Sequence, residues 1–224
     1  IQFANLAISK LNSGVSSDNF GAYQFAYKTK EYPDGKSNAL GWMNYTIGYI
    51  MYYRMSKKED AIPYLYKATQ FNSGTKKDPA IYATIGDEYF ATVTKMQDER
   101  DKWDKTSEGW GDRVKMSVAK EKAYVDRAID AYARSYGLVR NNPKTSSEYK
   151  TAILTVLKDL YNFRYEKPEL KTIVKINADV TSISSKPMPN PATTPTVETP
   201  TTEKKVETTG AASRSRTVTS ADNR

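Results

Sequence analysis

The sequence predicts an all-α fold: a stack of antiparallel helical hairpins followed by a disordered C-terminal tail. Apolar residues recur at helical spacing in one segment after another, short turns rich in Gly, Pro and Asn separate these segments, and one helix pattern occurs twice. Beyond about residue 184, Thr, Pro and Ser replace the large apolar side chains, so this part buries too little surface to offset its chain entropy. We therefore expect a helical repeat domain over 1–183 and a disordered tail over 184–224.

The N-terminal part of the chain is predicted to form two helical hairpins. The first joins a short amphipathic helix over 1–11 to a helix over about 17–31, and a turn with Gly14 separates them. The second joins a helix over 37–55 to a helix over 61–71. Both helices of the second hairpin carry more apolar and aromatic surface than a lone hairpin can bury, so we expect neighbours on both sides.

Two residues indicate where the two helices of this second hairpin begin. Ser37 is the expected N-cap of its first helix, because a serine side chain accepts a hydrogen bond from the free backbone N–H groups of a first turn. Pro63 is expected in the first turn of the second helix, where its missing N–H group costs nothing.

The rest of the domain is predicted to contain a longer hairpin and a shorter pair of helices. Helices over about 80–103 and 113–138 flank a loop with two glycines. A helix over 146–166 follows, and a last short helix ends near Asn177. Residues 95–122 mix acidic and basic side chains almost equally, which is typical of an exposed hairpin with many ion pairs.

The composition excludes several kinds of active site. The chain of 224 residues has no Cys and no His, so it lacks the usual zinc ligands, a thiol nucleophile and the base of a Ser-His-Asp triad. We expect no cofactor and no metal. The formal net charge of +8 favours acidic partners. The chain has 17 Tyr and 6 Phe, and tyrosine suits half-buried helix faces and interfaces.

Compartment is only weakly constrained by the sequence. No apolar run approaches the ~20 residues that a membrane-spanning helix needs. The lack of Cys suits an exported bacterial protein that avoids stray disulfides, and it suits a cytosolic protein equally well. Of the two we favour an exported protein of the cell envelope. The chain opens at Ile1 without Met, so we expect a processed chain or a fragment.

One helix pattern occurs twice, at an offset of 38 residues (84 − 46). Thr46-Ile47-Gly48 matches Thr84-Ile85-Gly86, and aromatic residues follow both. A glycine inside a helix costs about 1 kcal/mol relative to alanine, so we expect each one to allow close contact with a neighbouring helix. The return helices also share a pattern of small, large and small residues: Ala61, Leu65 and Ala68 match Ala128, Tyr132 and Ser135.

These residues resemble the tetratricopeptide repeat, a helix-turn-helix unit of about 34 residues with a small residue at its eighth position. The resemblance places Gly48 and Gly86 at that position, and Ala61 and Ala128 at the small position of the second helix. It covers roughly residues 1–165, as one good, one elongated and one truncated repeat. The step from Gly48 to Ala61 is one residue longer than the family spacing, and the step from Gly86 to Ala128 is longer by about 30 residues.

The resemblance implies a right-handed, TPR-like α-solenoid whose first helices line a concave groove for a protein or peptide. The groove positions of the best repeat are five aromatic residues: Trp42, Tyr45, Tyr49, Tyr52 and Tyr53. Those of the next repeat are Ala83, Asp87, Phe90 and Ala91. Such a groove suits a peptide with apolar or Pro-rich anchors, since Tyr and Trp dominate binding hot spots. The alternative is that several of the aromatic residues simply pack against neighbouring hairpins.

Three further patterns do not amount to an active site. Ser117 and Lys120 match the S-x-x-K spacing of serine acyl-enzymes, but the companion motifs are missing. Asp87-Glu88 and Asp98-Glu99 supply carboxylates without the His partners of a di-metal site, so we interpret both pairs as solvated faces. No Gly-rich phosphate loop occurs in the sequence.

Our first hypothesis is a non-enzymatic module that binds or scaffolds a protein or peptide through the groove. The alternative is a basic adaptor that contacts a polyanion, either nucleic acid or a cell-envelope polymer, with nucleic acid the less favoured of the two. Its patch is formed by lysines on what we take to be neighbouring inter-helix turns: Lys57, Lys58, Lys76 and Lys77. Partner identity and oligomeric state do not follow from the sequence.

Overall fold

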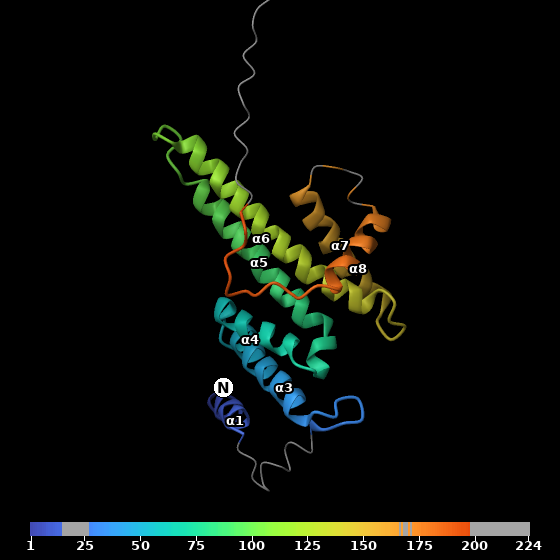
Figure 1. The fold of residues 1–224 in the computed structure, drawn as a ribbon. Coiled ribbons are helices and arrows are strands. Elements are labelled where there is room, and N and C mark those ends of the chain that lie inside the picture. The colour runs from blue at the N-terminus through green and yellow to red at the C-terminus, as the bar shows by residue number, and fades with distance from the viewer. Residues whose placement is uncertain (15–26, 166, 168–169, 171, 198–224) are drawn as a thin grey trace, which may run out of the picture.

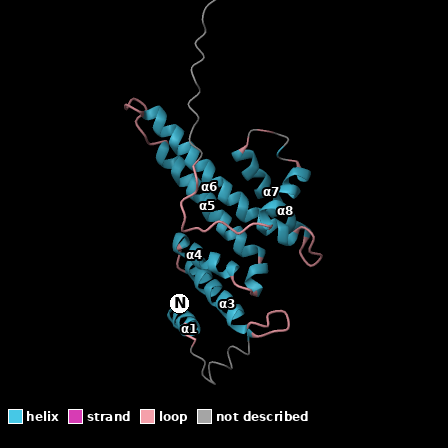
Figure 2. Cartoon of the chain, in the orientation of Figure 1, coloured by secondary structure: helices cyan, strands magenta, loops and turns pink. Residues whose placement is uncertain are grey.

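The computed structural model describes residues 1–14, 27–165, 167, 170 and 172–197, and within them it contains helices, turns and loops but no strand (Figure 2). The helices are α1 (Gln2–Asn12), α3 (Gly35–Tyr49), α4 (Lys58–Gln70), α5 (Pro79–Arg100), α6 (Trp110–Val139), α7 (Ser147–Arg164) and α8 (Ile173–Ser184). A π-helix, η1 (Ile50–Arg54), continues α3, and a short 3-10 helix, η2 (Gly74–Lys77), precedes α5. The all-α prediction is confirmed. Most of the predicted helix over 17–31 lies outside the described residues.

Consecutive helices pack in antiparallel pairs (Figure 1). In the α5–α6 pair, the Ser135 hydroxyl donates to the Pro79 carbonyl (2.9 Å), whereas Arg100 forms an ion pair with Glu121 at the far end. The start of α5 therefore lies beside the C-terminal part of α6 and the end of α5 beside an earlier part of α6, so the two helices are antiparallel. The α3–α4 pair is arranged in the same way, and α4 then packs against α5.

Both repeated glycines lie where two helices approach closely, as their positions predict. A Cβ atom on Gly48 would lie 2.7 Å from Cδ2 of Leu65, and a Cβ on Gly86 would lie 2.5 Å from the Tyr132 ring. Leu65 and Tyr132 are the matching large residues of the two return helices. The internal repeat seen in the sequence is therefore also a repeated packing contact.

The last two helices pack on α6 rather than extending freely beyond it. The Arg140 guanidinium at the end of α6 donates to the Asn177 carbonyl (3.1 Å) and the Thr181 hydroxyl (3.0 Å) of α8. The Tyr161 hydroxyl of α7 donates to the Asp179 carboxylate of α8 (2.9 Å). The main core is consequently continuous from α4 to α8.

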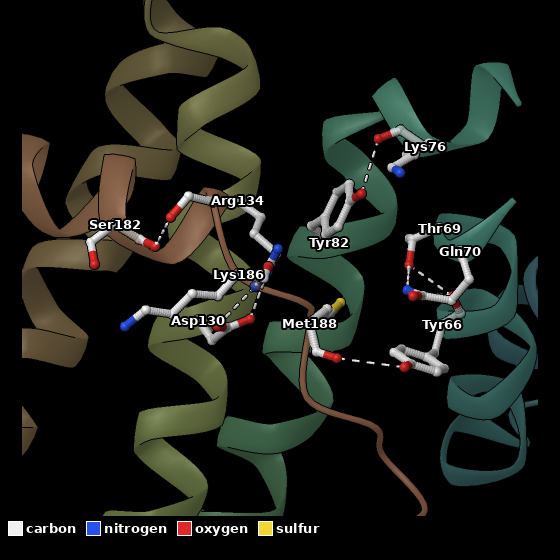
Figure 3. A network of polar contacts seen from close by, with 11 residues as sticks. Tyr66, Thr69, Gln70, Lys76, Tyr82, Asp130, Arg134, Ser182, Lys186 and Met188 are labelled. Atoms are coloured by element: carbon white, nitrogen blue, oxygen red, sulfur yellow. Dashed lines mark hydrogen bonds and ion pairs between the residues drawn. The ribbon is translucent and has the colours of Figure 1, made fainter. Parts of the chain in front are cut away.

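Residues 185–197 leave α8 as a non-helical segment, the C-terminal strap, that crosses α6 and reaches α4 (Figures 1 and 3). Met188 is buried, with 6% of its surface exposed, and its carbonyl accepts a hydrogen bond from the Tyr66 hydroxyl of α4 (3.5 Å). On α6, Arg134 donates to the Lys186 carbonyl (2.9 Å). The strap therefore touches both the α3–α4 and the α5–α6 hairpin.

The strap lies beyond residue 184, where the sequence predicts the tail to begin, and it contacts the helices. Arg127 of α6 donates to the Asn190 carbonyl (3.0 Å) and the Thr193 hydroxyl (3.0 Å), so this segment packs on the helices. Backbone carbonyls make most of these contacts, and they leave no periodic pattern in the sequence. Residues 185–197 belong with the helical domain, whereas 198–224 lie outside the described residues.

Three helix ends also differ from prediction. Asp34, not Ser37, caps α3, and its carboxylate accepts from the Ser37 N–H (3.1 Å). Pro63 lies in the second turn of α4, because that helix already begins at Lys58. The last helix runs on to Ser184 because its apolar Ile176 and Val180 are buried against the preceding helices.

None of the described helices is both long enough and apolar enough to cross a membrane.

Candidate functional site

The aromatic residues of α3 and η1 form a continuous row of rings along one side of the helix. Their spacings of three and four residues place side chains one above another on a helix surface. Ring centroids lie 5.8 Å apart for Trp42 and Tyr45, 5.8 Å for Tyr45 and Tyr49, and 4.9 Å for Tyr49 and Tyr53. Tyr52 joins the row, 4.8 Å from Tyr53. We call these five residues, together with Asp87 and Phe90 of α5, the aromatic face.

A wide helical turn brings the last two rings together. In η1 the Met55 N–H donates to the Ile50 carbonyl (3.0 Å), so this turn closes over five residues instead of four. Successive residues of an α-helix do not face each other, yet Tyr52 and Tyr53 have their rings in contact here. The wide turn accommodates one more residue than a regular α-helical turn.

The five aromatic residues of α3 and η1 divide into free and packed members. Trp42, Tyr49 and Tyr53 keep 37%, 39% and 53% of their surface exposed. Tyr45 and Tyr52 are half-buried and pack against the core. The alternative expectation, that some of these rings serve packing, therefore holds for two of the five.

Helix α5 contributes the other two residues of the aromatic face, Asp87 and Phe90, and contacts η1. The Thr84 hydroxyl donates to the Ala80 carbonyl (2.9 Å), so the Tyr53 hydroxyl, 2.8 Å away, donates to Thr84 and links η1 to α5. Asp87, one turn further on, is exposed and accepts a hydrogen bond from the Tyr132 hydroxyl of α6. The other two predicted positions, Ala83 and Ala91, are half-buried, and Ala83 packs on the core.

Phe90 extends the aromatic face towards α7. Its side chain is 38% exposed, and its ring meets that of Phe163 edge-on, with centroids 5.8 Å apart. Phe163 is itself 38% exposed. Phe163 was not predicted as a site residue, because the sequence repeat that identified the first helices does not extend visibly into α7.

Two carboxylates, together with burial, raise the pKa values of tyrosines at this face. Burial, and then the nearby Asp87 carboxylate, raises the pKa of Tyr52 to about 12. Burial and then Asp78 raise the pKa of Tyr45, and the same two causes raise the pKa of Tyr149 of α7. Tyr149 and Asp78 were missed by sequence reasoning, since their nearness to the α3 tyrosines depends on how α5 and α7 pack. All these hydroxyls stay protonated near neutral pH and can donate hydrogen bonds.

The four lysines predicted as a basic patch do not lie together. Lys57 and Lys58 precede or begin α4, and Lys76 and Lys77 lie in η2 beyond its end, so about 20 Å of helix separates the pairs. Successive turns of an antiparallel hairpin lie at opposite ends, which the sequence-based prediction overlooked. Lys77 also forms an ion pair with Glu31 (2.5 Å). The expected single patch is not formed.

The other candidate residues are occupied by structural contacts. The Ser117 hydroxyl donates to Glu121 (2.9 Å), which is paired with Arg100, rather than meeting Lys120. Glu88 is 5% exposed, and burial raises its pKa, so the prediction that it lies on a solvated face is wrong. The cause is its place on the core-facing side of α5. Among the described residues no group of three or more acidic, His or Cys side chains is placed to hold a metal ion.

Comparison with family models, with curated proteins and with solved structures finds no match to this chain. The tetratricopeptide resemblance therefore stays a prediction from the sequence. What the structure defines is an all-α protein with paired helices and an exposed aromatic row on its first complete hairpin.

Proposed function

We propose that this chain is a non-enzymatic module that binds a protein or peptide segment on the aromatic face. The observation that carries the proposal is the row of rings on α3 and η1, in which Trp42, Tyr49 and Tyr53 remain exposed. Exposed Trp and Tyr are the side chains that contribute most to protein interfaces, because they offer a large apolar area and a hydrogen-bonding tip.

The way the rings are held also supports this function. Tyr45 and Tyr52 pack on the core and contact the exposed rings, and the Tyr53 hydroxyl is bonded to Thr84. A partner that binds to rings already held in place loses less conformational freedom on binding.

A peptide array tests the proposal directly. The labelled full chain is applied to an array of random decapeptides, and affinities for the peptides it retains are measured by fluorescence anisotropy. We expect the double variant Y49A/Y53A to lose binding by roughly tenfold or more, since each deleted hot-spot ring typically costs 1 kcal/mol or more. Binding through rings should change little between about 50 and 200 mM salt, whereas binding to a polyanion would weaken steeply.

The control is F3A, which removes an aromatic side chain that is 85% exposed on α1, a helix that contributes no residue to the aromatic face. It should leave binding unchanged. If the array retains no peptide, or if Y49A/Y53A binds as the unaltered chain does, the proposed function is wrong.

A further inference from the structure

Negative charge gathers beside the aromatic face, although the chain as a whole is basic. The formal net charge is +8. The charged groups that act most on Tyr45 and Tyr52, however, are the carboxylates of Asp78 and Asp87. The Tyr53 hydroxyl is bonded to Thr84, one helical turn before Asp87, so this carboxylate lies beside the exposed end of the aromatic row.

Both carboxylates are held in position by α5. Asp78 caps the helix, and its side chain accepts from the Ala80 N–H (2.9 Å). Asp87 lies nine residues further along, about 13 Å away along the axis, and accepts from the Tyr132 hydroxyl. Within the described residues, the structure records no hydrogen bond to the second oxygen of either carboxylate, and a carboxylate oxygen can accept one.

One ring of the aromatic face already holds a cation over its π face. The Lys58 ammonium lies 5.4 Å from the centroid of the Tyr52 ring, in a cation–π contact. In the part of the chain that the structure describes, no lysine or arginine lies over the rings of Trp42, Tyr49 or Tyr53. These three are also the exposed members of the row.

We propose that the aromatic face selects a peptide segment that carries arginine or lysine, with the cation held over the exposed rings and paired with Asp78 or Asp87. This inference rests on the proposed function and names the chemistry of the partner. Arginine suits the arrangement best, because its flat guanidinium stacks on a ring and donates to a carboxylate at the same time. An acidic peptide or a polyanion would meet two carboxylates of like charge at this face.

Retention of basic peptides by a basic protein is the opposite of what its net charge predicts. By net charge alone, a chain with +8 should retain acidic peptides. If the local charge decides, the same decapeptide array should instead retain peptides enriched in arginine and lysine and depleted in aspartate and glutamate.

The decisive variant is D78N/D87N. Asparagine caps a helix as well as aspartate does, and its amide oxygen can still accept from Tyr132, so the fold should be preserved. We expect affinity for the retained basic peptides to fall by roughly threefold, the effect of losing an exposed ion pair, and affinity for versions with citrulline in place of arginine to stay the same. The matched control is D98N/D112N, which removes two exposed carboxylates from the distal α5–α6 hairpin and should change nothing.

The outcomes separate this inference from the proposed function. Peptides without basic enrichment, with binding still lost in Y49A/Y53A, would overturn the cationic anchor and leave peptide binding intact. Equal affinity of D78N/D87N and the unaltered chain for the basic peptides would overturn it as well. Acidic enrichment would show that net charge decides. Retention of no peptide at all overturns both.

Discussion

The α3–α4 and α5–α6 hairpins share one packing contact and differ in almost everything around it. In both, a glycine in the middle of the first helix lies against a large side chain of the second: Gly48 against Leu65, and Gly86 against Tyr132. Both first helices also bury the isoleucine that precedes the glycine, Ile47 or Ile85, at 0% exposure. The common sequence pattern thus specifies how the two helices of a hairpin meet.

The hairpins diverge in the residues directly after that glycine. In the first hairpin the helix widens into η1, which brings Tyr52 and Tyr53 side by side on the surface. In the second hairpin α5 continues as a regular helix, in which Glu88 and Tyr89 are buried and Asp87 and Phe90 are exposed. One core contact therefore supports a row of five aromatic rings in the first hairpin, and in the second a regular helix that adds exposed Asp87 and Phe90 to the same face.

The largest expected effect concerns the part that only the α5–α6 hairpin has, its long distal end. Arg100 pairs there with Glu121, which is 3% exposed and also accepts from the Ser117 hydroxyl. Replacing Arg100 by Ala leaves this carboxylate buried without its cation, so we expect the free energy of unfolding to fall by about 3 kcal/mol. Urea denaturation followed by circular dichroism measures this.

The control for that change is Lys115→Ala in the same helix. Lys115 pairs with Asp112 (3.2 Å), and both side chains are mostly exposed, so its loss should cost less than about 1 kcal/mol. Equal effects of the two substitutions would show that the distal end of this hairpin is as loosely held as an ordinary surface.

The next effect tests whether the C-terminal strap binds the two hairpins together. A chain ending at residue 184 loses the buried Met188 and the strap contacts of Tyr66 and Arg127, whereas a chain ending at 197 keeps them. Burial of one methionine side chain contributes about 1.5–3 kcal/mol. We expect the shorter chain to be less stable by about 2 kcal/mol in the same denaturation experiment, and the longer one to match the full chain. Two equally stable chains would mean that the strap adds nothing to the fold.

The sequence predicted the hairpins because their signals are local. Glycine and proline turns, apolar periodicity and the repeated Thr-Ile-Gly pattern each lie within one or two turns of helix, and they placed the close contacts of Gly48 and Gly86 correctly. The strap could not be predicted in this way. Apart from the buried Met188, it is held by carbonyl groups that accept from Arg127 and Arg134, and a backbone carbonyl has no sequence signature.

The part of the candidate site that lies within one helix was predicted, because its signal is also local. Helical spacing alone identified the row from Trp42 to Tyr53, because residues of one helix share a face whatever surrounds it. Which rings stay exposed, and that Asp78 and Tyr149 lie beside them, depends on the packing of α5 and α7 against α3. Such contacts between helices are set by the whole fold, so the sequence left them open.

The repeated glycines allow a direct comparison of the two hairpins. Alanine at Gly48 or Gly86 introduces a Cβ within 2.7 Å or 2.5 Å of a packed side chain, which must shift. After allowing for the better helix propensity of alanine, we expect each substitution to cost about 1–2 kcal/mol. Gly111→Ala is the control, since nothing lies within 4 Å of its Cβ position and the helix should gain stability. A stabilising effect at Gly48 or Gly86 would show that the shared contact is looser than its geometry indicates.

The smallest effect concerns the hydrogen bond between Tyr53 of η1 and Thr84 of the second hairpin. Tyr53→Phe removes the donor to Thr84 (2.8 Å) and leaves the ring in place. Because Tyr53 is 53% exposed, water can replace part of this bond, so we expect a loss of about 0.5–1 kcal/mol and faster amide exchange in residues 50–54. Tyr49→Phe is the matched control, because the structure records no hydrogen bond of that hydroxyl among the described residues. If Tyr53→Phe alone speeds exchange, the wide turn is held in shape from α5, and the aromatic face depends on both hairpins. If neither variant does, η1 is maintained by its own helix, and the second hairpin serves the face only through Asp78, Asp87 and Phe90.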